Sequence, residues 1–423
     1  MAIARVRPVV AVAGCILAVA AAMWLAPGLE DRPIRPSDFD SEVRALDRDI
    51  KTIVAPARQG IPPQQAMRLA QGLYRRGTLT QRSSDFDQLH AVLDGLNRDL
   101  GADPDVLLFR ATLDLRFHRL GAARASLAGS PHLGGDVEAQ LIAADIDVQQ
   151  GRYDLAQRTY ERVVEARPTW PALARLAYLA ALRGDGARAD RLYAEAEEDV
   201  TAKEMRTYAW VKLQRGQLAF TRGRYDDAQA HYAIAERAYS GFWLVDEYMA
   251  ELLAARGRFD EAIARYARAA ARAPRPDLFQ QIGDLYAFIG RFEDARPWHR
   301  RALEGYVASV DRGEVQFLHH LAGYYADVAR DGASAVKWAR RDVELRPHYS
   351  TDDALAWSLY VAGDIQEAAR VSDRALASGI VDGHLYYHAA TIKAAAGDAD
   401  GAARWLAALS QLNPRYRDFH VHR

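Results

Sequence analysis

Two histidines four residues apart offer the sharpest chemistry in this sequence. His384 and His388 would lie on one face of a helix, because residues i and i+4 project to the same side. Asp353 and Trp357 are expected on the neighbouring helix, and two imidazoles with one carboxylate form a workable zinc-ligand set. Exposed histidine pairs on helices are more often incidental, so we expect no bound metal and no cofactor. Metal handling through this pair is kept as an alternative function.

The rest of the sequence has no recognisable catalytic motif. It lacks a G-x-S-x-G nucleophile turn, a G-x-x-x-x-G-K-[ST] phosphate loop, a strand followed by G-x-G-x-x-G, and H-E-x-x-H. Its single cysteine, Cys15, lies in an apolar N-terminal stretch, which excludes an internal disulfide and a thiol-ligated zinc site. The acidic residues from Glu195 to Asp199 are interpreted as a solvated helix end. We therefore expect a protein that is not an enzyme.

The elements that would position any site come from one short pattern, which recurs ten times between Ser84 and Ala402. Its clearest copies begin at Gly151, Gly223, Gly257 and Gly290 and read Gly-Arg-aromatic-acidic-x-Ala; weaker copies begin at Ser84, His118, Gly184, Arg330, Gly363 and Gly397. Most steps between copies are 33 or 34 residues, and two are 39 and 40. Such regularity is typical of a solenoid whose units pack only on their neighbours.

Each unit is predicted to be a pair of helices, because apolar residues follow a 3.6-residue period before and after the pattern. The glycine suits a left-handed turn that ends the first helix. The alanine at the end of the pattern lets the two helices approach closely. A proline is expected to end the second helix of several units, at Pro168, Pro274, Pro347 and Pro414.

These units resemble tetratricopeptide repeats over residues 62–414. The resemblance implies an all-α fold, a right-handed superhelical solenoid of antiparallel helix pairs with about ten repeats. The unit around Ser84 is the weakest, since Leu89 replaces the small alanine. The two long steps imply longer helices or loops near Glu195–Arg206 and Glu304–Gln316. The family uses such a superhelix to hold peptides or partner helices on its concave face.

The resemblance also implies which side chains of the first helices face the concave groove. The predicted partner-binding groove consists of Trp210, Gln214, Gln217, Glu247, Tyr248, Glu251, Gln280, Gln281, Asp284, His320, Tyr324, Asp353, Trp357, Tyr360, His384, Tyr387 and His388. This surface is aromatic and mildly acidic, which favours a basic or polar, partly aromatic protein segment. The Lys and Asn residues with which the family clamps acidic chaperone tails are missing from the matching positions, so a C-terminal carboxylate ligand is not expected.

The first 26 residues indicate export. Arg5 and Arg7 precede an uncharged run from Val9 to Ala26, about 27 Å long as a helix and just enough for a bilayer. We interpret residues 1–26 as a signal-anchor; a cleaved signal peptide and lipidation at Cys15 are the other two interpretations. All three place the body of the chain in a bacterial periplasm, either free or facing it from the inner membrane. Residues 27–61 are predicted as a proline-rich spacer and a short helix capped by Ser37.

Charge and the C-terminal end restrict the partners. Lys and Arg number 55 against 56 Asp and Glu, which argues against nucleic-acid binding. Residues 415–423 form a short tail, too brief for a full capping helix. The apolar residues Trp405, Leu406, Leu409 and Leu412 therefore either pack on the preceding helix or are covered by the tail, by a partner or by a second copy in a homo-oligomer.

The sequence thus predicts a non-catalytic scaffold or adaptor that docks a protein segment for envelope or membrane-complex assembly, with the N-terminal segment in the membrane. Two alternatives stay open. A polysaccharide-export scaffold would use the aromatic groove to contact glycans. A metal-handling periplasmic protein would use His384 and His388.

Overall fold

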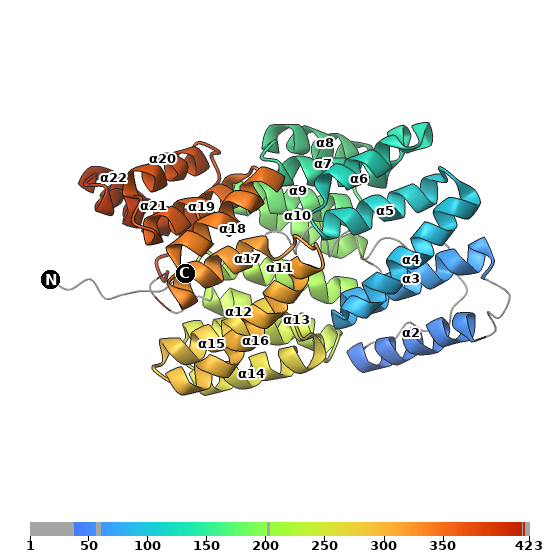
Figure 1. Ribbon diagram of the computed structural model, residues 1–423, viewed down its shortest axis with the longest axis horizontal. Helices are drawn as coiled ribbons and strands as arrows, with labels where there is room; N and C mark the ends of the chain where they lie inside the picture. Colours follow the sequence, from blue (N-terminus) through green and yellow to red (C-terminus); the bar gives the residue numbers. More distant parts are fainter. Residues whose placement is uncertain (1–37, 56–60, 201–203, 417, 419–423) are drawn as a thin grey trace.

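The computed structural model describes residues 38–55, 61–200, 204–416 and 418, and this part of the chain is almost entirely helical (Figure 1). A 3-10 helix (Pro131–Gly135) precedes α7, and a π-helix (Tyr324–Ala329) continues α17. The α-helices are α2 (Phe39–Val54), α3 (Pro63–Thr80), α4 (Ser83–Leu100), α5 (Pro104–Arg116), α6 (Leu120–Ala128), α7 (Val137–Gln149), α8 (Tyr153–Ala166), α9 (Trp170–Leu182), α10 (Gly186–Asp199), α11 (Met205–Phe220), α12 (Tyr225–Ala238), α13 (Trp243–Ala255), α14 (Phe259–Arg272), α15 (Pro276–Phe288), α16 (Phe292–Asp311), α17 (Leu318–Gly323), α18 (Gly332–Leu345), α19 (Tyr349–Val361), α20 (Ile365–Leu376), α21 (Gly383–Ala395) and α22 (Ala399–Leu412).

Consecutive helices pack as antiparallel pairs. In the described residues the pairs are α3/α4, α5/α6, α7/α8, α9/α10, α11/α12, α13/α14, α15/α16, α17/α18, α19/α20 and α21/α22. Each pair contains one copy of the sequence pattern, and α2 packs on α3 ahead of the first pair. The expected all-α solenoid of about ten helix pairs is therefore confirmed.

The repeated pattern marks the corner between the two helices of a pair. In one clear copy, Gly223 has a φ of +71°, Tyr225 begins α12, and Ala228 is fully buried. The left-handed φ is one that a side chain with a Cβ disfavours, which explains the glycine. The same corner recurs at Gly151, Gly257 and Gly290. The second helices α8, α14, α18 and α22 end two residues before the predicted prolines.

Weak copies of the pattern keep this corner without glycine. His118 and Arg330 each have a φ of +57°. In the first unit the left-handed residue is Gln81, with a φ of +58°, and α4 begins at Ser83. The predicted register at Ser84 was therefore wrong, because without a glycine the pattern alone does not fix the corner. The longer helix expected near Glu304–Gln316 is confirmed, since α16 runs for 20 residues.

The short helix ahead of the array is α2. Asp38 caps it, because its carboxylate accepts a 2.8 Å hydrogen bond from the Ser41 N–H. The cap predicted at Ser37 was wrong, and the apolar segment 1–26 with Cys15 lies outside the described residues. Among the helices that the structure describes, none is both long enough and apolar enough to cross a membrane.

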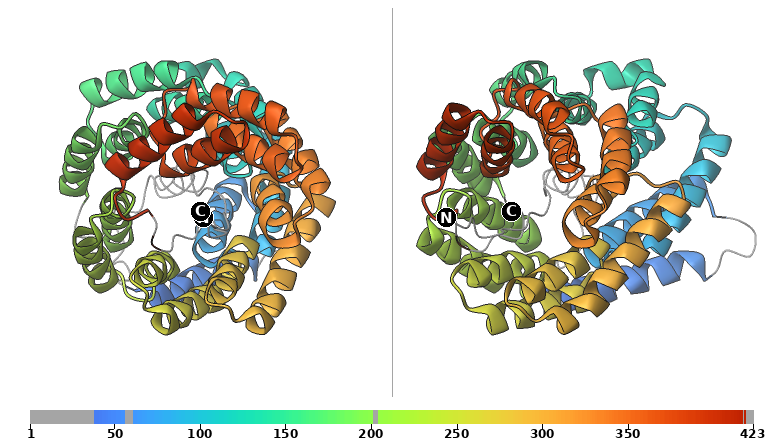
Figure 2. Two further views of the ribbon diagram at one scale, coloured as in Figure 1. Left: turned by 90° about the vertical axis from the view of Figure 1, so that its left-hand side faces the viewer. Right: turned by 60° about the vertical axis from the view of Figure 1, so that its left-hand side comes forward.

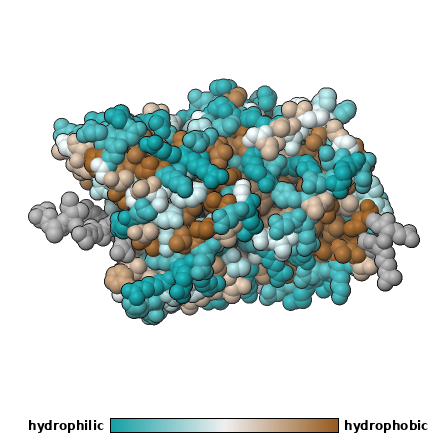
Figure 3. Space-filling model, viewed as in Figure 1, coloured by the Kyte–Doolittle hydropathy of each residue, from teal (hydrophilic) through white to brown (hydrophobic). Residues whose placement is uncertain are grey.

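The solenoid meets itself after just under six repeats. Hydrogen bonds join Tyr239 to Glu42 and Arg346 to Gln149, both 197 residues apart, and Tyr349 to Tyr153, 196 residues apart. These contacts place one superhelical turn directly on the next. The helices accordingly form a ring in Figure 2. The contacts between turns enclose the concave face. The side of the molecule seen in Figure 3 is largely hydrophilic, with smaller apolar areas among the hydrophilic ones.

The C-terminal end is partly covered by its own chain. Trp405 packs against Tyr386 with ring centroids 5.0 Å apart, and Leu409 is only 5% exposed. Tyr416, beyond α22, packs against Tyr387 with a centroid distance of 5.9 Å. The preceding helix and the residues after α22 therefore cover most of this apolar face, and Leu406 remains 49% exposed.

Candidate functional site

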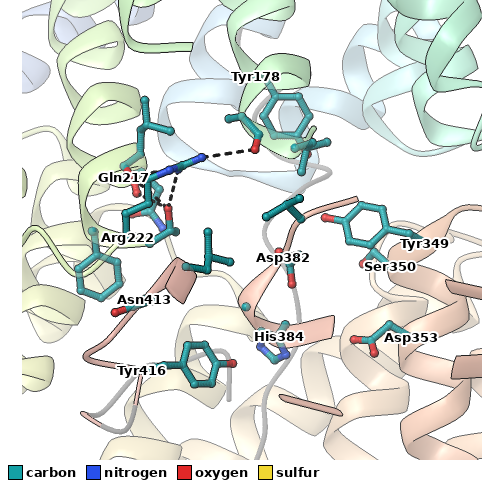
Figure 4. A pocket seen from close by; sticks show the side chains of 18 of the residues that line it. Tyr178, Gln217, Arg222, Tyr349, Ser350, Asp353, Asp382, His384, Asn413 and Tyr416 are labelled. Atoms are coloured by element: carbon teal, nitrogen blue, oxygen red, sulfur yellow. Dashed lines mark hydrogen bonds between the residues drawn. The ribbon is translucent and has the colours of Figure 1, made fainter. Parts of the chain in front are cut away.

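A cavity of about 220 Å³ lies inside the ring, between one superhelical turn and the next (Figure 4). Helices α9, α11 and α13 form one wall, and α19 and α21 form the other. We call it the inter-turn cavity. Its polar and aromatic lining includes Tyr178, Tyr193, Gln214, Gln217, Phe220, Arg222, Tyr248, Glu251, His319, Tyr349, Ser350, Asp353, Asp382, His384, His388, Asn413 and Tyr416.

A backbone hydrogen bond joins the two walls at the rim of the cavity. The N–H of Val381, just before α21, donates a 2.8 Å hydrogen bond to the carbonyl oxygen of Leu182 at the end of α9. A second contact between the turns lies at the residues after α22, which approach α12. There the Tyr225 hydroxyl donates a 3.4 Å hydrogen bond to the carbonyl oxygen of Arg415. The cavity thus exists because two turns touch along its rim.

Two of the carboxyl groups that line the cavity, those of Glu251 and Asp382, have raised pKa values. Burial and then the neighbouring Glu247 raise the pKa of Glu251 to about 8, so this side chain keeps its proton at neutral pH. Burial also raises the pKa of Asp382. Arg222 is the one guanidinium among the lining residues, and burial lowers its pKa. A cation bound in the cavity would favour the ionised forms of the Glu251 and Asp382 carboxyl groups.

The structure brings part of the predicted groove together at this cavity. The predicted residues among its lining are Gln214, Gln217, Tyr248, Glu251, Asp353, His384 and His388. They come from α11, α13, α19 and α21, two inner helices from each turn. These residues are far apart in the sequence, and they line one cavity because consecutive superhelical turns contact each other.

Other predicted groove residues serve the packing between repeats. The aromatic side chains Trp210, Tyr324 and Trp357 are buried, and Trp357 donates its indole N–H to Asp327 at 3.0 Å. Tyr360 packs on Trp357 at 4.9 Å, and Tyr387 packs on Tyr416. These rings fill space inside the array.

The remaining predicted polar residues have partners within the array. Glu247 accepts 2.9 Å hydrogen bonds from Arg275, and Gln281 donates to the same carboxylate at 3.4 Å. Gln280 accepts from the Tyr306 hydroxyl at 2.9 Å, and Asp284 lies 2.9 Å from the His299 ring. These inward-facing residues therefore form hydrogen bonds within the array and do not line the inter-turn cavity.

A second, larger cavity of about 660 Å³ adjoins the first and contains the predicted residue His320. Its histidines are His90, His118, His319, His320 and His348, and its arginines are Arg116, Arg119, Arg275, Arg312 and Arg346. Burial lowers the pKa of His320 to about 4, so this ring is neutral at pH 7. Arg346 is bonded to Asp342 at 2.8 Å and Arg275 to Glu247, so these cations already have internal counter-ions.

Three of the cavity residues have the composition of a metal site. One potential ligand atom from each of Asp353, His384 and His388 lies within 4.8 Å of the others. His388 Nδ1 is 2.9 Å from Asp353 Oδ2, and the His388 ring stacks on Trp357 at a centroid distance of 4.3 Å. The sequence analysis expected the two histidines on one face and Asp353 on the neighbouring first helix, and the structure places Asp353 of α19 beside His388 of α21.

Sequence reasoning missed the lining residues that lie outside the first helices. Asp382 directly precedes α21, and Asn413 and Tyr416 follow α22. Groove positions are counted along first helices, so no signal in that numbering points to them. Only the contact between turns reveals that they share a cavity.

A family model described as tetratricopeptide repeat matches residues 137–169, which span α7 and α8. None of the curated proteins compared with this chain matches it. Similar solved structures include a thermophilic TPR protein of Thermus thermophilus, 21% identical with a TM-score of 0.35, covering 41% of this chain and 94% of its own. MamA is 19% identical with a TM-score of 0.31, over 40% of this chain and 96% of its own. The APC/C hetero-tetramer Cut9–Hcn1 is 12% identical with a TM-score of 0.35, over 89% and 90%.

The family match covers one unit, and the same helix-pair corner recurs through the described residues, from α3/α4 to α21/α22. The described helix pairs are similar to tetratricopeptide repeats, and the family model identifies one of them, over residues 137–169.

Proposed function

We propose that this chain is a non-catalytic scaffold that holds a segment of a partner protein, with a Lys or Arg side chain of that segment in the inter-turn cavity. The observation that carries the proposal is the convergence of predicted groove residues on one cavity, Gln217 from α11, Glu251 from α13 and His384 from α21. At about 220 Å³ the cavity is smaller than the roughly 300–1,000 Å³ of small-molecule pockets. It therefore suits one long side chain.

The lining chemistry supports a cationic side chain. Three carboxyl groups, those of Glu251, Asp353 and Asp382, face the cavity. An ammonium or guanidinium group would favour their ionised forms and so lower the raised pKa of Glu251. The rings of Tyr178 and Tyr349 add aromatic surface for a cation.

We also propose that the protein faces a bacterial periplasm, anchored in the inner membrane by its first residues, and takes part in envelope or membrane-complex assembly. The support is the pattern of Arg5 and Arg7 ahead of the uncharged run from Val9 to Ala26. Alkaline phosphatase fused after Arg423 should be active and should sediment with membranes. An inactive fusion would contradict this location.

Site-specific photocrosslinking tests the docking cavity. A benzophenone amino acid in place of Gln217, which is half-buried at the cavity, should crosslink in cells to a partner segment with Lys or Arg. The same probe in place of Asp260, on the outer helix α14, is the control. We expect the Gln217 adduct to weaken in a Glu251→Gln background. Equal adducts from both positions, or adducts with no basic residue, would refute the cavity as the docking site.

A further inference from the structure

We propose that Asp353, His384 and His388 bind one divalent transition-metal ion of the zinc class at the wall of the inter-turn cavity. Potential ligand atoms from the three residues lie within 4.8 Å of one another. Ligands about 2.1 Å from one ion lie roughly 3–4 Å apart, so small side-chain rotations would gather all three. The site goes beyond the scaffold function, because it needs no partner protein.

His388 and Asp353 are already in direct contact. His388 Nδ1 and Asp353 Oδ2 are 2.9 Å apart, a hydrogen-bond distance, so these two atoms would separate slightly to bind one ion. His388 is 1% exposed and Asp353 is 7% exposed. Buried polar atoms that lack a partner are costly, and Asp353 Oδ1 and His388 Nε2 have no hydrogen-bond partner. A cation beside the carboxylate would relieve part of this cost.

Neighbouring side chains hold the ligands in place. His384 and His388 are one helical turn apart on α21, and their ring centroids are 5.0 Å apart. Trp357 stacks on the His388 ring with an interplanar angle of 15°, and Asp327 fixes Trp357 through its indole N–H. Supporting contacts of this kind orient metal-binding histidines and reduce the entropy lost on binding.

The ligand set and its surroundings indicate which ions fit. Two imidazoles and one carboxylate suit Zn²⁺, Ni²⁺, Co²⁺ or Cu²⁺, whereas Mg²⁺ and Ca²⁺ prefer all-oxygen sets. All three residues line the cavity, where Ser350 and Asp382 are also found. Three protein ligands leave at least one coordination position to water or to another group in the cavity. The site is therefore of the open type.

Zinc titration of the full-length, tag-free protein by calorimetry tests the site, after metal removal with EDTA. We expect one Zn²⁺ per chain with a Kd in the micromolar range or below. His384→Gln, His388→Gln and Asp353→Asn should each weaken binding at least tenfold. Zn²⁺ should also slow hydrogen exchange in α19 and α21, the two helices that the ion would join.

Matched controls separate this site from other histidines. His132→Gln changes an exposed histidine, and the pair His420→Gln and His422→Gln removes those near the C-terminus. Both controls should bind zinc as the unchanged protein does. Binding that survives in all three site variants, or that disappears with His420 and His422, would overturn the proposal, as would no stoichiometric binding.

Two further measurements guard against variants that fail to fold. His384 is half-buried, so His384→Gln is the substitution that the fold should tolerate best, and its melting curve verifies this. Co²⁺ bound to the unchanged protein should give visible absorption bands of four- or five-coordinate cobalt, and an octahedral spectrum would contradict the ligand set. Zinc binding is measured without any partner, so its failure leaves the crosslinking test of the docking cavity unaffected.

Discussion

The hydroxyl of Tyr239 donates a 2.6 Å hydrogen bond to the carboxylate of Glu42, which lies 197 residues earlier in α2. Both side chains are buried, and Arg75 and Arg206 approach the same carboxylate at 3.2 and 3.4 Å. Burial alone would raise the pKa of Glu42. The positive charges of the two arginines lower it by more than burial raises it, so the pKa of Glu42 is below its ordinary value. Glu42 is therefore ionised at neutral pH, and a charge-assisted bond ties one superhelical turn to the next.

Tyr239→Phe should weaken this tie. The substitution removes only the hydroxyl, so we expect a loss of about 1–3 kcal/mol in the free energy of unfolding, because a buried carboxylate oxygen loses its donor. Chemical denaturation measures the loss, and hydrogen exchange should show it in α2. Tyr286→Phe is the control, since its ring keeps its contact with Arg291. Equal stability of the two variants would show that the inter-turn bond contributes nothing.

Two glycines of the same motif report on the contact between turns. A Cβ at Gly151 would lie 2.8 Å from the Pro347 carbonyl oxygen of the next turn, whereas a Cβ at Gly257 would meet nothing within 4 Å. Their φ angles of +71° and +74° are nearly the same, so the backbone strain of an alanine, about 1 kcal/mol, is shared. We expect Gly151→Ala to cost about 1–3 kcal/mol more than Gly257→Ala, the usual range for overpacking. Matched melting curves of the two variants would argue that the turns do not touch.

The local part of this fold follows from the sequence, and the closure of the turns does not. The glycine, aromatic and alanine of the pattern occupy fixed places at each corner, so Gly223, Tyr225 and Ala228 predicted where one helix ends and the next begins. Contacts such as Arg346 with Gln149 depend on superhelical pitch, which sums small rotations over many repeats. The pattern of residues within one repeat does not predict this pitch.

The alanine of the pattern offers a direct check of helix packing. Ala262 on α14 is fully buried where α13 and α14 meet, so a leucine there has no room. We expect Ala262→Leu to destabilise the array by about 1–3 kcal/mol. Ala264→Leu, on the exposed side of the same helix, should change the melting temperature little. If both variants melt alike, the close approach of the two helices at Ala262 is not a packing constraint.

The sequence predicted which side chains face the inside of the superhelix, but not which of them line the cavity. Inward-facing positions gave Gln214, Gln217 and Glu251, which line the inter-turn cavity. The same rule gave Trp210 and Trp357, which are buried in the packing between repeats, because burial depends on which neighbours the curvature brings close. Asp382 and Tyr416 were beyond the rule, since they lie at a helix start and after the last helix.

Glu251 should make the stability of the protein fall as the pH rises. In the folded protein its carboxyl group keeps a proton up to about pH 8, whereas the ordinary pKa in the unfolded chain is 4.5. Between these two values the unfolded state binds fewer protons than the folded state, so the free energy of unfolding decreases with pH. The slope is at most about 1.4 kcal/mol per pH unit, which gives a loss on the order of 2 kcal/mol between pH 6 and pH 8.

Glu251→Gln tests this dependence, because glutamine keeps the shape of the protonated acid and does not titrate. We expect the variant to lose about 2 kcal/mol less than the unchanged protein between pH 6 and pH 8. Urea denaturation at pH 6, 7 and 8, with EDTA present to keep metal out of the cavity, measures the difference. Glu304→Gln, at an exposed position of α16, should leave the pH dependence unchanged. The same pH dependence in both variants would mean that Glu251 ionises without cost, and a cation would then gain nothing from entering beside it.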